Sequence, residues 1–429
     1  MAQTTYVFIY LPGRIHPTVA GRFDWESGVS PHVGEFVYAE SYLANEASVP
    51  LDPIALPLRA QVFATTLSSG FFGVFRDAIP DDWGRHVALK LFGDSYQTDF
   101  DYLWLHTTDR IGALAFGQST HGPVEEKPLL EWQQLEQSAL LDAIQHIDRD
   151  IPLTVAEEEA VLAFGAGTSA GGARPKLSVG RNGNVWLAKL NRHSDRYNVV
   201  RVECAMLDLA AACGISVPEH GVEQVHGQDV LLVRRFDRAV SPGGILRHRM
   251  VSAATVFQAD EAAARYSYAG SYPRLARELS RWTLTGDQDR RQLFRRIAFH
   301  SLASVTDDHD RNHALIAENA NFRLSPAFDL VPQPGNTQRR YLALAIGDFG
   351  ALAARQNMIS SIDAFGLSPR EANGIIDEVQ EVVRANWRKS CASCGVPDTD
   401  VARIEGCFDP PFFESELAPK GALDDRPVG

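Results

Sequence analysis

The stretch from residue 165 to residue 237 constrains the fold of this chain more than any other part. It opens with a glycine-rich segment, GAGTSAGGARPK, and continues as two apolar runs that meet at an Asn-Gly pair, a strong hairpin signal. A helical pattern over about 198–213 follows and ends at Gly214, and a second hairpin then turns at Gly227. We therefore expect a glycine loop, two strands, one helix and two strands, in that order.

The flanking parts of the chain carry different patterns. Residues 1 to about 60 alternate short β-prone runs with Gly and Pro, which is typical of a small antiparallel sheet. A helix is expected after Pro80, because Asp81 and Asp82 place carboxylates where a helix N-terminus favours them. Beyond residue 250 the apolar spacing is mainly helical. The expected fold class is therefore α/β (α+β), and the expected domains are 1–150, 151–240 and 241–429.

The composition is that of a folded protein with an acidic surface. Hydrophobic residues make up 45% of the 429 residues, which excludes a largely disordered chain. Asp and Glu number 54 against 41 Lys and Arg, and the net charge of −13 disfavours direct binding of nucleic acid over a broad face. No apolar stretch approaches the roughly 20 residues of a membrane helix, and the first residues do not have the pattern of a signal peptide. We expect no association with membranes.

The cysteines point to a reduced environment. Their number is five, odd and low for this length, which argues against a disulfide framework and favours a cytoplasmic protein. Cys391 and Cys394 form a single CxxC pair that Cys407 could join. A zinc site would need a fourth ligand, and no CxxH or second CxxC lies nearby in the sequence. We therefore interpret these residues as thiols near a helix end without a metal.

The strongest chemical signal is the heptapeptide TDDHDRN, residues 306–312, which follows a clearly helical pattern. Two strand-like runs, HALIA and NFRLS, come next, and AFDLVP follows them. In an antiparallel hairpin, the residue numbers of any two paired positions have the same sum. Positions 312 and 329 are symmetric about the expected turn, so this sum would be 641. Such a hairpin would return Asp329 to the neighbourhood of Asn312. Asp307, Asn312 and Asp329 could then converge at one end of it.

Three oxygen-bearing side chains in this arrangement suit a hard cation. Mg²⁺ takes a few carboxylate or amide oxygens and leaves the rest of its shell to water and phosphate. Protein kinases place one Asp five residues before an Asn and a second Asp past a hairpin; the first orients or deprotonates the substrate hydroxyl, and the other two hold the metal. The alternative is that the acids and Asn312 only solvate the end of a helix.

The glycine-rich segment and a lysine after it fit the same chemistry. The segment matches neither GxxxxGK[ST] nor GxGxxG, yet the backbone N–H groups of a glycine loop before a strand can wrap phosphate oxygens. Ser169 within it is a candidate for modification. Lys189 lies in the apolar run VWLAKL, where a lysine needs an anion such as a nucleotide phosphate or Glu203. The alternatives are a flexible connection between domains and a lysine that reaches the surface.

Taken together, these segments resemble the HipA family, the serine/threonine kinase toxins of bacterial toxin–antitoxin modules. YVFIYLPG, FFGVFRDAIPDDWGR and DRIGALAFG are similar to the N-terminal subdomain of that family. SAGGARPKL, VECAMLDLAAACGISVPE, LLVRRFDR, TDDHDRN and AFDLVP are similar to its kinase core. The resemblance spans most of the chain but is weak after about residue 350. It implies a two-lobed, protein-kinase-like fold with a β-rich N-terminal subdomain, a small lobe over 151–240 and a helical C-lobe, using ATP and Mg²⁺.

The resemblance also implies roles for individual residues. Asp307 corresponds to the catalytic Asp of the family, Asn312 and Asp329 to its metal ligands, and Lys189 to its phosphate-binding lysine.

Further positions follow from the same resemblance. Ser169 corresponds to the serine that the family autophosphorylates, which inactivates the enzyme. His309 stands two residues after the catalytic Asp, where ordinary kinases carry a lysine near the γ-phosphate. The remaining nucleotide-binding positions lie in the glycine loop and the hinge: Gly171, Gly172, Ala173, Arg174, Arg234 and Phe236.

The function expected from this resemblance is that of an ATP- and Mg²⁺-dependent protein serine/threonine kinase. Its implied partners are a HipB-like helix-turn-helix antitoxin and a protein substrate, for which a tRNA-charging enzyme (an aminoacyl-tRNA synthetase) is the family's example. Two alternatives stay open. One is a nucleotide-binding, non-catalytic partner of a transcriptional repressor. The other is a metal-dependent phosphoesterase built on Asp307, Asp308, His309 and Asp310.

Overall fold

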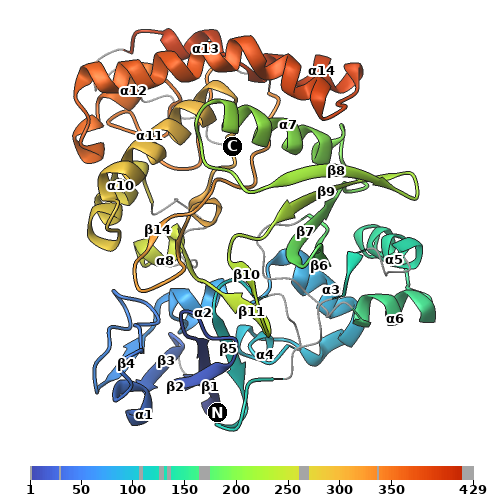
Figure 1. Ribbon diagram of the computed structural model, residues 1–429, viewed down its shortest axis with the longest axis vertical. Helices are drawn as coiled ribbons and strands as arrows, with labels where there is room; N and C mark the ends of the chain where they lie inside the picture. The colour runs from blue at the N-terminus through green and yellow to red at the C-terminus, as the bar shows by residue number, and fades with distance from the viewer. Residues whose placement is uncertain are drawn as a thin grey trace. The chain divides into compact units, whose positions relative to one another are not determined.

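The computed structural model describes residues 2–28, 30–105, 110–124, 130–132, 137–163, 174–259, 270–335 and 338–417 (Figure 1). The chain divides into two compact units, neither of which is continuous in sequence. Unit 1 consists of Met1–Val200, Pro218–Ser267 and Ala314–Ser325, and unit 2 consists of Arg201–Val217, Tyr268–His313 and Pro326–Gly429.

The first sheet of unit 1 is antiparallel and has the strand order β4-β3-β2-β1-β5. It confirms the sheet expected for the first 60 residues, and it gains strands from later in the chain. Its strands are β1 (Ala2–Tyr10), β2 (Pro17–Glu26), β3 (Val33–Tyr38), β4 (Val62–Thr65) and β5 (Leu114–Gly117). One face is covered by aromatic rings, because alternate residues such as Phe23 and Trp25 point inward and pack against Phe71, Phe75 and Phe100. The short helices α1 (Glu40–Leu43), α2 (Gly73–Asp77) and α4 (Asp99–Tyr102) complete this part of unit 1.

The second sheet of unit 1 has the order β6-β7-β9-β8 and consists of the two predicted hairpins. In the first hairpin, β6 (Lys176–Arg181) and β7 (Asn184–Leu190) turn at Asn182 and Gly183, which have φ of 49° and 71°. In the second, β8 (His220–Val225) and β9 (Gln228–Arg234) turn at His226 and Gly227, with φ of 48° and 78°. Two consecutive positive φ angles are typical of the two-residue turns that match the twist of paired strands.

Three helices pack with this second sheet around one apolar core. They are α3 (Asp82–Phe92), α5 (Gln137–Asp148) and α6 (Val155–Ala163). The helix expected after Pro80 is confirmed: the Asp81 side chain accepts a hydrogen bond of 2.8 Å from the Gly84 N–H and caps the start of α3.

A third sheet in unit 1 contains the hairpin expected after the heptapeptide, in a different register. Its strands are β12 (Arg249–Ser252), β13 (Ala314–Ala317) and β14 (Arg323–Leu324). Leu315 pairs with Leu324, so that paired positions sum to 639 and not to the expected 641. The Asn319 side chain accepts a 3.0 Å hydrogen bond from the Asn321 N–H and moves the turn toward the N-terminal strand. The predicted pairing of positions 312 and 329 was therefore wrong by two residues.

The small elements around this sheet are the hairpin β10 (Arg238–Ser241) and β11 (Gly244–Arg247) and the helix α8 (Ala253–Phe257). Short 3₁₀ turns occur at η1 (Leu67–Ser69), η2 (Gly93–Ser95), η4 (Asp310–Asn312), η5 (Ile362–Phe365), η6 (Glu405–Cys407) and η7 (Pro411–Glu414).

Unit 2 is helical, as expected beyond residue 250. Its helices are α7 (Val199–Ala212, from Arg201 on), α10 (Tyr272–Trp282), α11 (Gly286–Leu302), α12 (Arg355–Ile359), α13 (Pro369–Ser393) and α14 (Asp398–Ile404). Helix α11 is central, because Leu293, Phe294 and Ile297 are fully buried and both α10 and α13 pack against it (Figure 1). Among the helices that the structure describes, none combines the length and the apolar character that crossing a membrane requires.

Candidate active site

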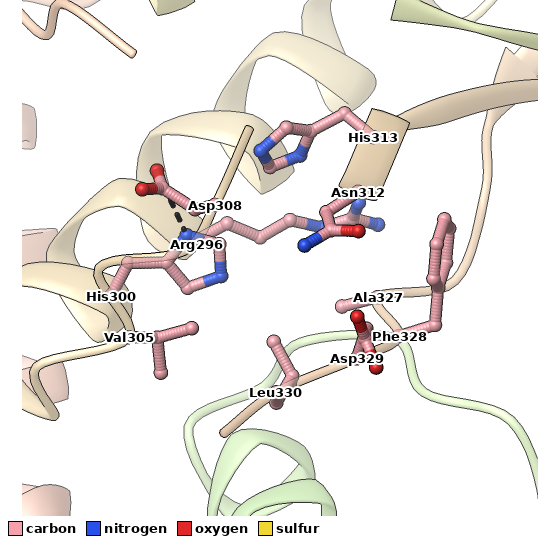
Figure 2. Close-up of a pocket in the computed structure, with 10 residues that line it drawn as sticks. All are labelled: Arg296, His300, Val305, Asp308, Asn312, His313, Ala327, Phe328, Asp329 and Leu330. Carbon is pink, nitrogen blue, oxygen red and sulfur yellow. Dashed lines mark ion pairs between the residues drawn. The ribbon is translucent and has the colours of Figure 1, made fainter. Parts of the chain in front are cut away.

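A pocket in unit 2 lies where α11 ends and the heptapeptide begins (Figure 2). Three segments line it: the last turns of α11, residues 305–313, and residues 327–330. Its lining side chains are Arg296, His300, Val305, Asp308, Asn312, His313, Ala327, Phe328, Asp329 and Leu330.

Two of the three expected oxygen donors face this pocket together. The Asn312 amide and the Asp329 carboxylate are both half-buried and point into the same space in Figure 2. Asn312 donates a 2.7 Å hydrogen bond from Nδ2 to the Asp307 carbonyl, which leaves its Oδ1 as the atom for a cation. An amide oxygen beside a carboxylate suits Mg²⁺. The structure thus brings Asn312 and Asp329 together, although not by the register that the sequence predicted.

Asp329 has an unusual backbone conformation. Its φ is 58°, in the left-handed region that residues other than Gly, Asn and Asp rarely adopt. Asp is thus one of the few residue types that this backbone position accommodates readily.

Asp307, the third donor, differs from its neighbour Asp308. Its side chain is exposed and is not among the groups that line the pocket, whereas its carbonyl receives the Asn312 amide. Asp308 is 1% exposed and its carboxylate points into the interior. The side chains of these two consecutive acids therefore lie on opposite faces of one loop.

The buried face of the loop is held by neutral donors around Asp308. The Ala343 N–H donates to Asp308 Oδ1 over 2.8 Å, and the Tyr272 hydroxyl donates to Oδ2. The same hydroxyl is 2.9 Å from Nδ1 of His300, and that nitrogen is 3.6 Å from Asp308 Oδ2. Tyr272 and His300 are both buried. This cluster fixes the backbone on which Asp307 stands.

Burial controls the ionisation of the groups beneath the pocket. Burial, together with the Asp308 charge, raises the pKa of Tyr272 well above its ordinary value, so this hydroxyl stays a donor. Burial lowers the pKa of Arg296 to about 10, which leaves the guanidinium charged at neutral pH. Burial and then the nearby His300 and Arg296 lower the pKa of His313 well below its usual range, so its ring stays neutral.

Sequence reasoning missed Tyr272, His300 and Arg296. The sequence did carry a signal for two of them. Arg296 and His300 are four residues apart on the apolar face of a helix, and a polar residue there indicates a buried polar partner. Nothing in the sequence near Tyr272 connects it to position 308.

Two family models match the chain. One, described as the HipA-like C-terminal domain, matches residues 168–387, just over half of the chain. The other, described as the HipA N-terminal domain, matches residues 14–117. The chain belongs to the HipA family.

Solved structures agree with this assignment. The chain is similar to HipA from Shewanella oneidensis MR-1, solved with HipB and operator DNA, with a TM-score of 0.65, 17% identity and 94% of each chain covered. This likeness confirms the expected fold class, the mixed α/β fold of HipA. A weaker similarity, with a TM-score of 0.37 and 10% identity, is to the Helicobacter pylori proinflammatory kinase CtkA and covers 55% of this chain and 90% of that one. No curated protein sequence matches the chain.

Several positions that the HipA resemblance assigns to nucleotide binding lie in unit 1. Lys189 is a buried residue of β7, opposite Lys176 of β6 and Leu231 of β9. Arg174 forms an ion pair: its guanidinium donates to both carboxylate oxygens of Asp195, at 2.7 and 2.6 Å.

The expected hinge also belongs to unit 1. The Arg234 side chain is exposed, and its backbone N–H donates to the Glu219 carbonyl over 2.8 Å. Phe236 is half-buried. Arg234 is the last residue of β9, and Phe236 lies two residues after it.

The other predicted positions divide between the heptapeptide and the glycine loop. His309 is half-buried and caps η4, with Nδ1 accepting a 3.3 Å hydrogen bond from the Arg311 N–H. Ser169, Gly171, Gly172 and Ala173 lie outside the described residues.

Proposed function

We propose that this HipA-family chain is an ATP- and Mg²⁺-dependent protein serine/threonine kinase and the toxin of a toxin–antitoxin pair. One observation carries the proposal: Asn312 and Asp329 present oxygen donors to one pocket, next to a loop that exposes the Asp307 carboxylate. Family membership supports it, because the three residues match the positions of catalytic and metal-binding residues in the family resemblance.

Asp307 would accept the proton of the incoming hydroxyl or orient it, because its exposed carboxylate can reach a group on another protein. Asn312 and Asp329 would hold Mg²⁺, which when bound neutralises phosphate charge. The Asn312 bond to the Asp307 carbonyl couples the metal ligand to the base. Catalysis would then depend mainly on positioning.

The family resemblance assigns the remaining groups. Lys189 would bind a phosphate oxygen through its ammonium, and the loop around Gly171 and Gly172 would surround the phosphates with N–H groups. Phosphorylation of Ser169 would add about −1.5 to −2 charges to that loop and weaken ATP binding, as a means of inactivation.

The partners we propose are an antitoxin of the HipB kind and a protein substrate. The solved HipA of Shewanella oneidensis is part of a complex with HipB and operator DNA. The net charge of −13 is suited to a basic, DNA-binding partner. The protein substrate that the family resemblance suggests is a tRNA-charging enzyme.

The geometry speaks against the phosphoesterase alternative. A metal centre made of residues 307–310 would need those side chains to converge, but Asp308 points into the interior toward Tyr272, Asp307 is exposed, and His309 caps η4. The non-catalytic alternative is left to the experiment.

The test is transfer of the γ-phosphate from labelled ATP in the presence of Mg²⁺. Asp307→Asn should lower the rate by roughly 10²- to 10⁴-fold with ATP affinity largely kept. Asp329→Asn should weaken Mg²⁺-dependent ATP binding, measured by calorimetry. Asp310→Asn, in the same loop, is the matched control and should retain most activity. Equal loss in Asp310→Asn and Asp307→Asn, or ATP binding without any transfer by the unaltered chain, would refute the kinase assignment.

The phosphorylation of Ser169 is tested in a separate experiment. After incubation with ATP, intact-mass analysis and peptide mapping should find the added phosphate on the peptide that contains Ser169. Phosphate found only elsewhere would exclude this means of inactivation.

A further inference from the structure

Two thiols that are far apart in the sequence are in contact in unit 2. Cys204 lies on α7, and Cys394 directly follows the last residue of α13. Their Sγ atoms are 2.7 Å apart, although 190 positions separate the residues. Both side chains are buried, with exposed fractions of 5% and 7%. The CxxC spacing suggested Cys391 as the natural neighbour of Cys394, yet the contact is with a different helix.

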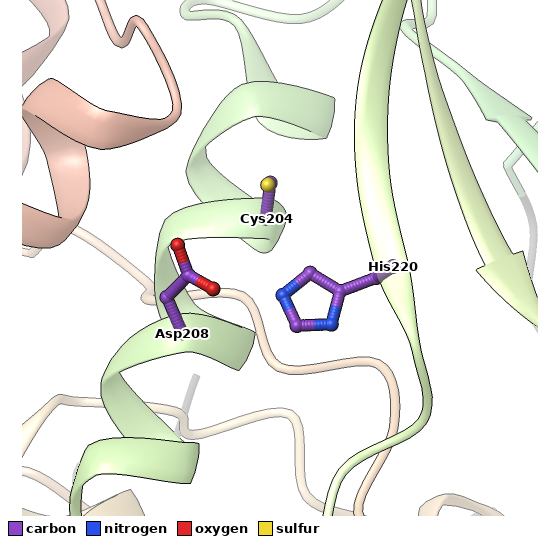
Figure 3. Close-up of side chains that lie close together, drawn as sticks. All are labelled: Cys204, Asp208 and His220. Carbon is purple, nitrogen blue, oxygen red and sulfur yellow. The ribbon is translucent and has the colours of Figure 1, made fainter.

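Polar contacts hold the two helices in place around this pair. Arg201 on α7 donates from Nη1 to the Cys394 carbonyl over 2.9 Å. Asp208, one turn after Cys204 on α7 (Figure 3), accepts from Ser393 Oγ at 3.3 Å and from Cys394 Sγ at 3.4 Å. These contacts fix the end of α13 against α7. Disulfide formation needs the sulfur atoms to approach by a fraction of an ångström.

We propose that Cys204 and Cys394 form an intrachain disulfide on oxidation and that this pair is a redox modification site of the protein. The inference stands on the sulfur contact and does not depend on the proposed function. The disulfide would join α7 covalently to the end of α13.

The oxidant that fits the site is a small, uncharged peroxide, because both thiols are buried. One thiol reacts with hydrogen peroxide: its sulfur bonds to one oxygen, the O–O bond breaks, and the products are a sulfenic acid and one water. The second sulfur then attacks the sulfenic sulfur and displaces a second water, giving the disulfide. Two thiols and one peroxide thus yield one disulfide and two waters. The proton of the attacking thiol leaves in that second water.

The ionisation of the pair determines the rate of this reaction. The contact with Cys204, and then burial, raise the pKa of Cys394 far above its ordinary value. Because the thiolate is the reactive form, oxidation of the folded protein should be slow and should need more peroxide than an exposed thiol needs. The pair is thus suited to respond to sustained oxidation.

The experiment maps disulfides in the full-length chain after graded treatment with hydrogen peroxide. Remaining thiols are alkylated under denaturing conditions, and tryptic peptides are analysed by mass spectrometry. Trypsin leaves Cys204 with Cys213 in one peptide and Cys391 with Cys394 in another. The double variant Cys213→Ser with Cys391→Ser therefore makes the linked pair unambiguous.

We expect a link between the two peptides in both proteins, with a loss of about 2 Da and reversal by a thiol reductant. In the unaltered chain the alkylated cysteines should fall from five to three. Oxidation should also raise the midpoint of thermal unfolding by roughly 5 °C, because the bridge closes a long loop in the unfolded chain. The matched control, Cys204→Ser, should show neither the link nor the shift.

Three results would overturn the proposal. One is a bridge within the peptide that holds Cys391 and Cys394. Another is loss of two thiols in the Cys204→Ser variant. The third is that the unaltered, folded chain forms no link, whether its cysteines are oxidised to sulfinic acid or do not react. Since the mapping of the unaltered chain needs no substitution, poor folding of a variant would not remove the test.

Discussion

Two buried carboxylates, one in each unit, are held by opposite kinds of partner. In unit 1, Asp237 accepts from Arg235 at 2.9 and 2.8 Å, from Arg238 at 2.7 Å and from the Gly112 N–H at 2.9 Å. In unit 2, Asp308 accepts from a backbone N–H and from a tyrosine hydroxyl, and Nδ1 of His300 lies 3.6 Å from its Oδ2. Burial acts to raise the pKa of Asp237, but the two guanidinium groups outweigh it and hold that pKa well below its ordinary value.

This difference indicates different roles. A carboxylate between two buried cations is a structural centre, because loss of its charge leaves the cations uncompensated. A carboxylate held mainly by a backbone N–H and a hydroxyl can be altered at lower cost to stability. The main effect of altering Asp308 should be on the position of the loop that presents Asp307. We therefore expect stability to respond most at Asp237 and phosphoryl transfer to respond most at Asp308.

The largest effect on stability is expected for Asp237→Asn. The substitution keeps the shape but leaves Arg235 and Arg238 buried without their counter-charge, which should lower the free energy of unfolding by about 3–5 kcal/mol. Urea unfolding measures this value. The control is Asp24→Asn, which breaks an exposed pair with Arg22 and should change stability by about 0–1 kcal/mol. A loss at Asp237 no larger than at Asp24 would show that the buried charges do not form a structural centre.

Asp308→Asn should have a smaller effect on stability and a larger one on activity. The amide can keep one of the two acceptor contacts, so we expect a loss of about 1–3 kcal/mol in unfolding free energy. If the proposed function holds, a displaced Asp307 should reduce the rate of phosphoryl transfer roughly 10- to 100-fold, with ATP affinity unchanged. A variant that loses as much stability as Asp237→Asn and no activity would contradict the comparison.

The sequence predicted those parts of the fold that depend on neighbouring residues. The hairpins at Asn182–Gly183 and His226–Gly227 were correct, because a two-residue turn with positive φ determines its own strand pairing. The register of β13 and β14 was wrong by two residues, because the longer turn is shaped by the Asn319 side chain, and symmetry of the sequence carries no information on that.

The candidate site shows the same limit. The convergence of Asn312 and Asp329 could be predicted, because their types and order match a known chemistry. The contacts that hold Asp308 could not be predicted, because Tyr272 lies 36 positions before Asp308 and the Ala343 N–H lies 35 positions after it. Contacts of this kind depend on how the helices pack, which the pattern of one segment does not contain.

Tyr272→Phe sharpens the comparison within unit 2. The variant keeps the buried ring and removes the hydroxyl that serves both His300 and Asp308, so we expect a loss of about 1–2 kcal/mol in unfolding free energy. The matched control is Tyr42→Phe in unit 1, whose hydroxyl donates to the Val49 carbonyl over 2.7 Å, and the loss there should be about 1 kcal/mol. A reduction of phosphoryl transfer in Tyr272→Phe and not in Tyr42→Phe is the expected readout of positioning.

A third buried carboxylate, Asp52, extends the comparison through pH. Burial raises its pKa from 3.8 to about 6, although the Ala55 and Ile54 N–H groups and Gln258 donate to it. Since its pKa is higher in the folded chain than in the unfolded one, the folded state binds more protons between these values. Its contribution to stability is therefore greatest at low pH and declines as the pH rises through 6.

Between pH 5 and pH 7 this decline should amount to about 1 kcal/mol. Asp52→Asn should abolish it, because an amide does not titrate there, and the variant should be the more stable protein at pH 7. Urea unfolding of both proteins at the two pH values isolates this contribution, since the other titrating groups are common to both. An unchanged pH dependence in Asp52→Asn would mean that neutral donors alone can keep a buried carboxylate ionised in this chain. The contrast between Asp237 and Asp308 would then not arise from the charge of their partners.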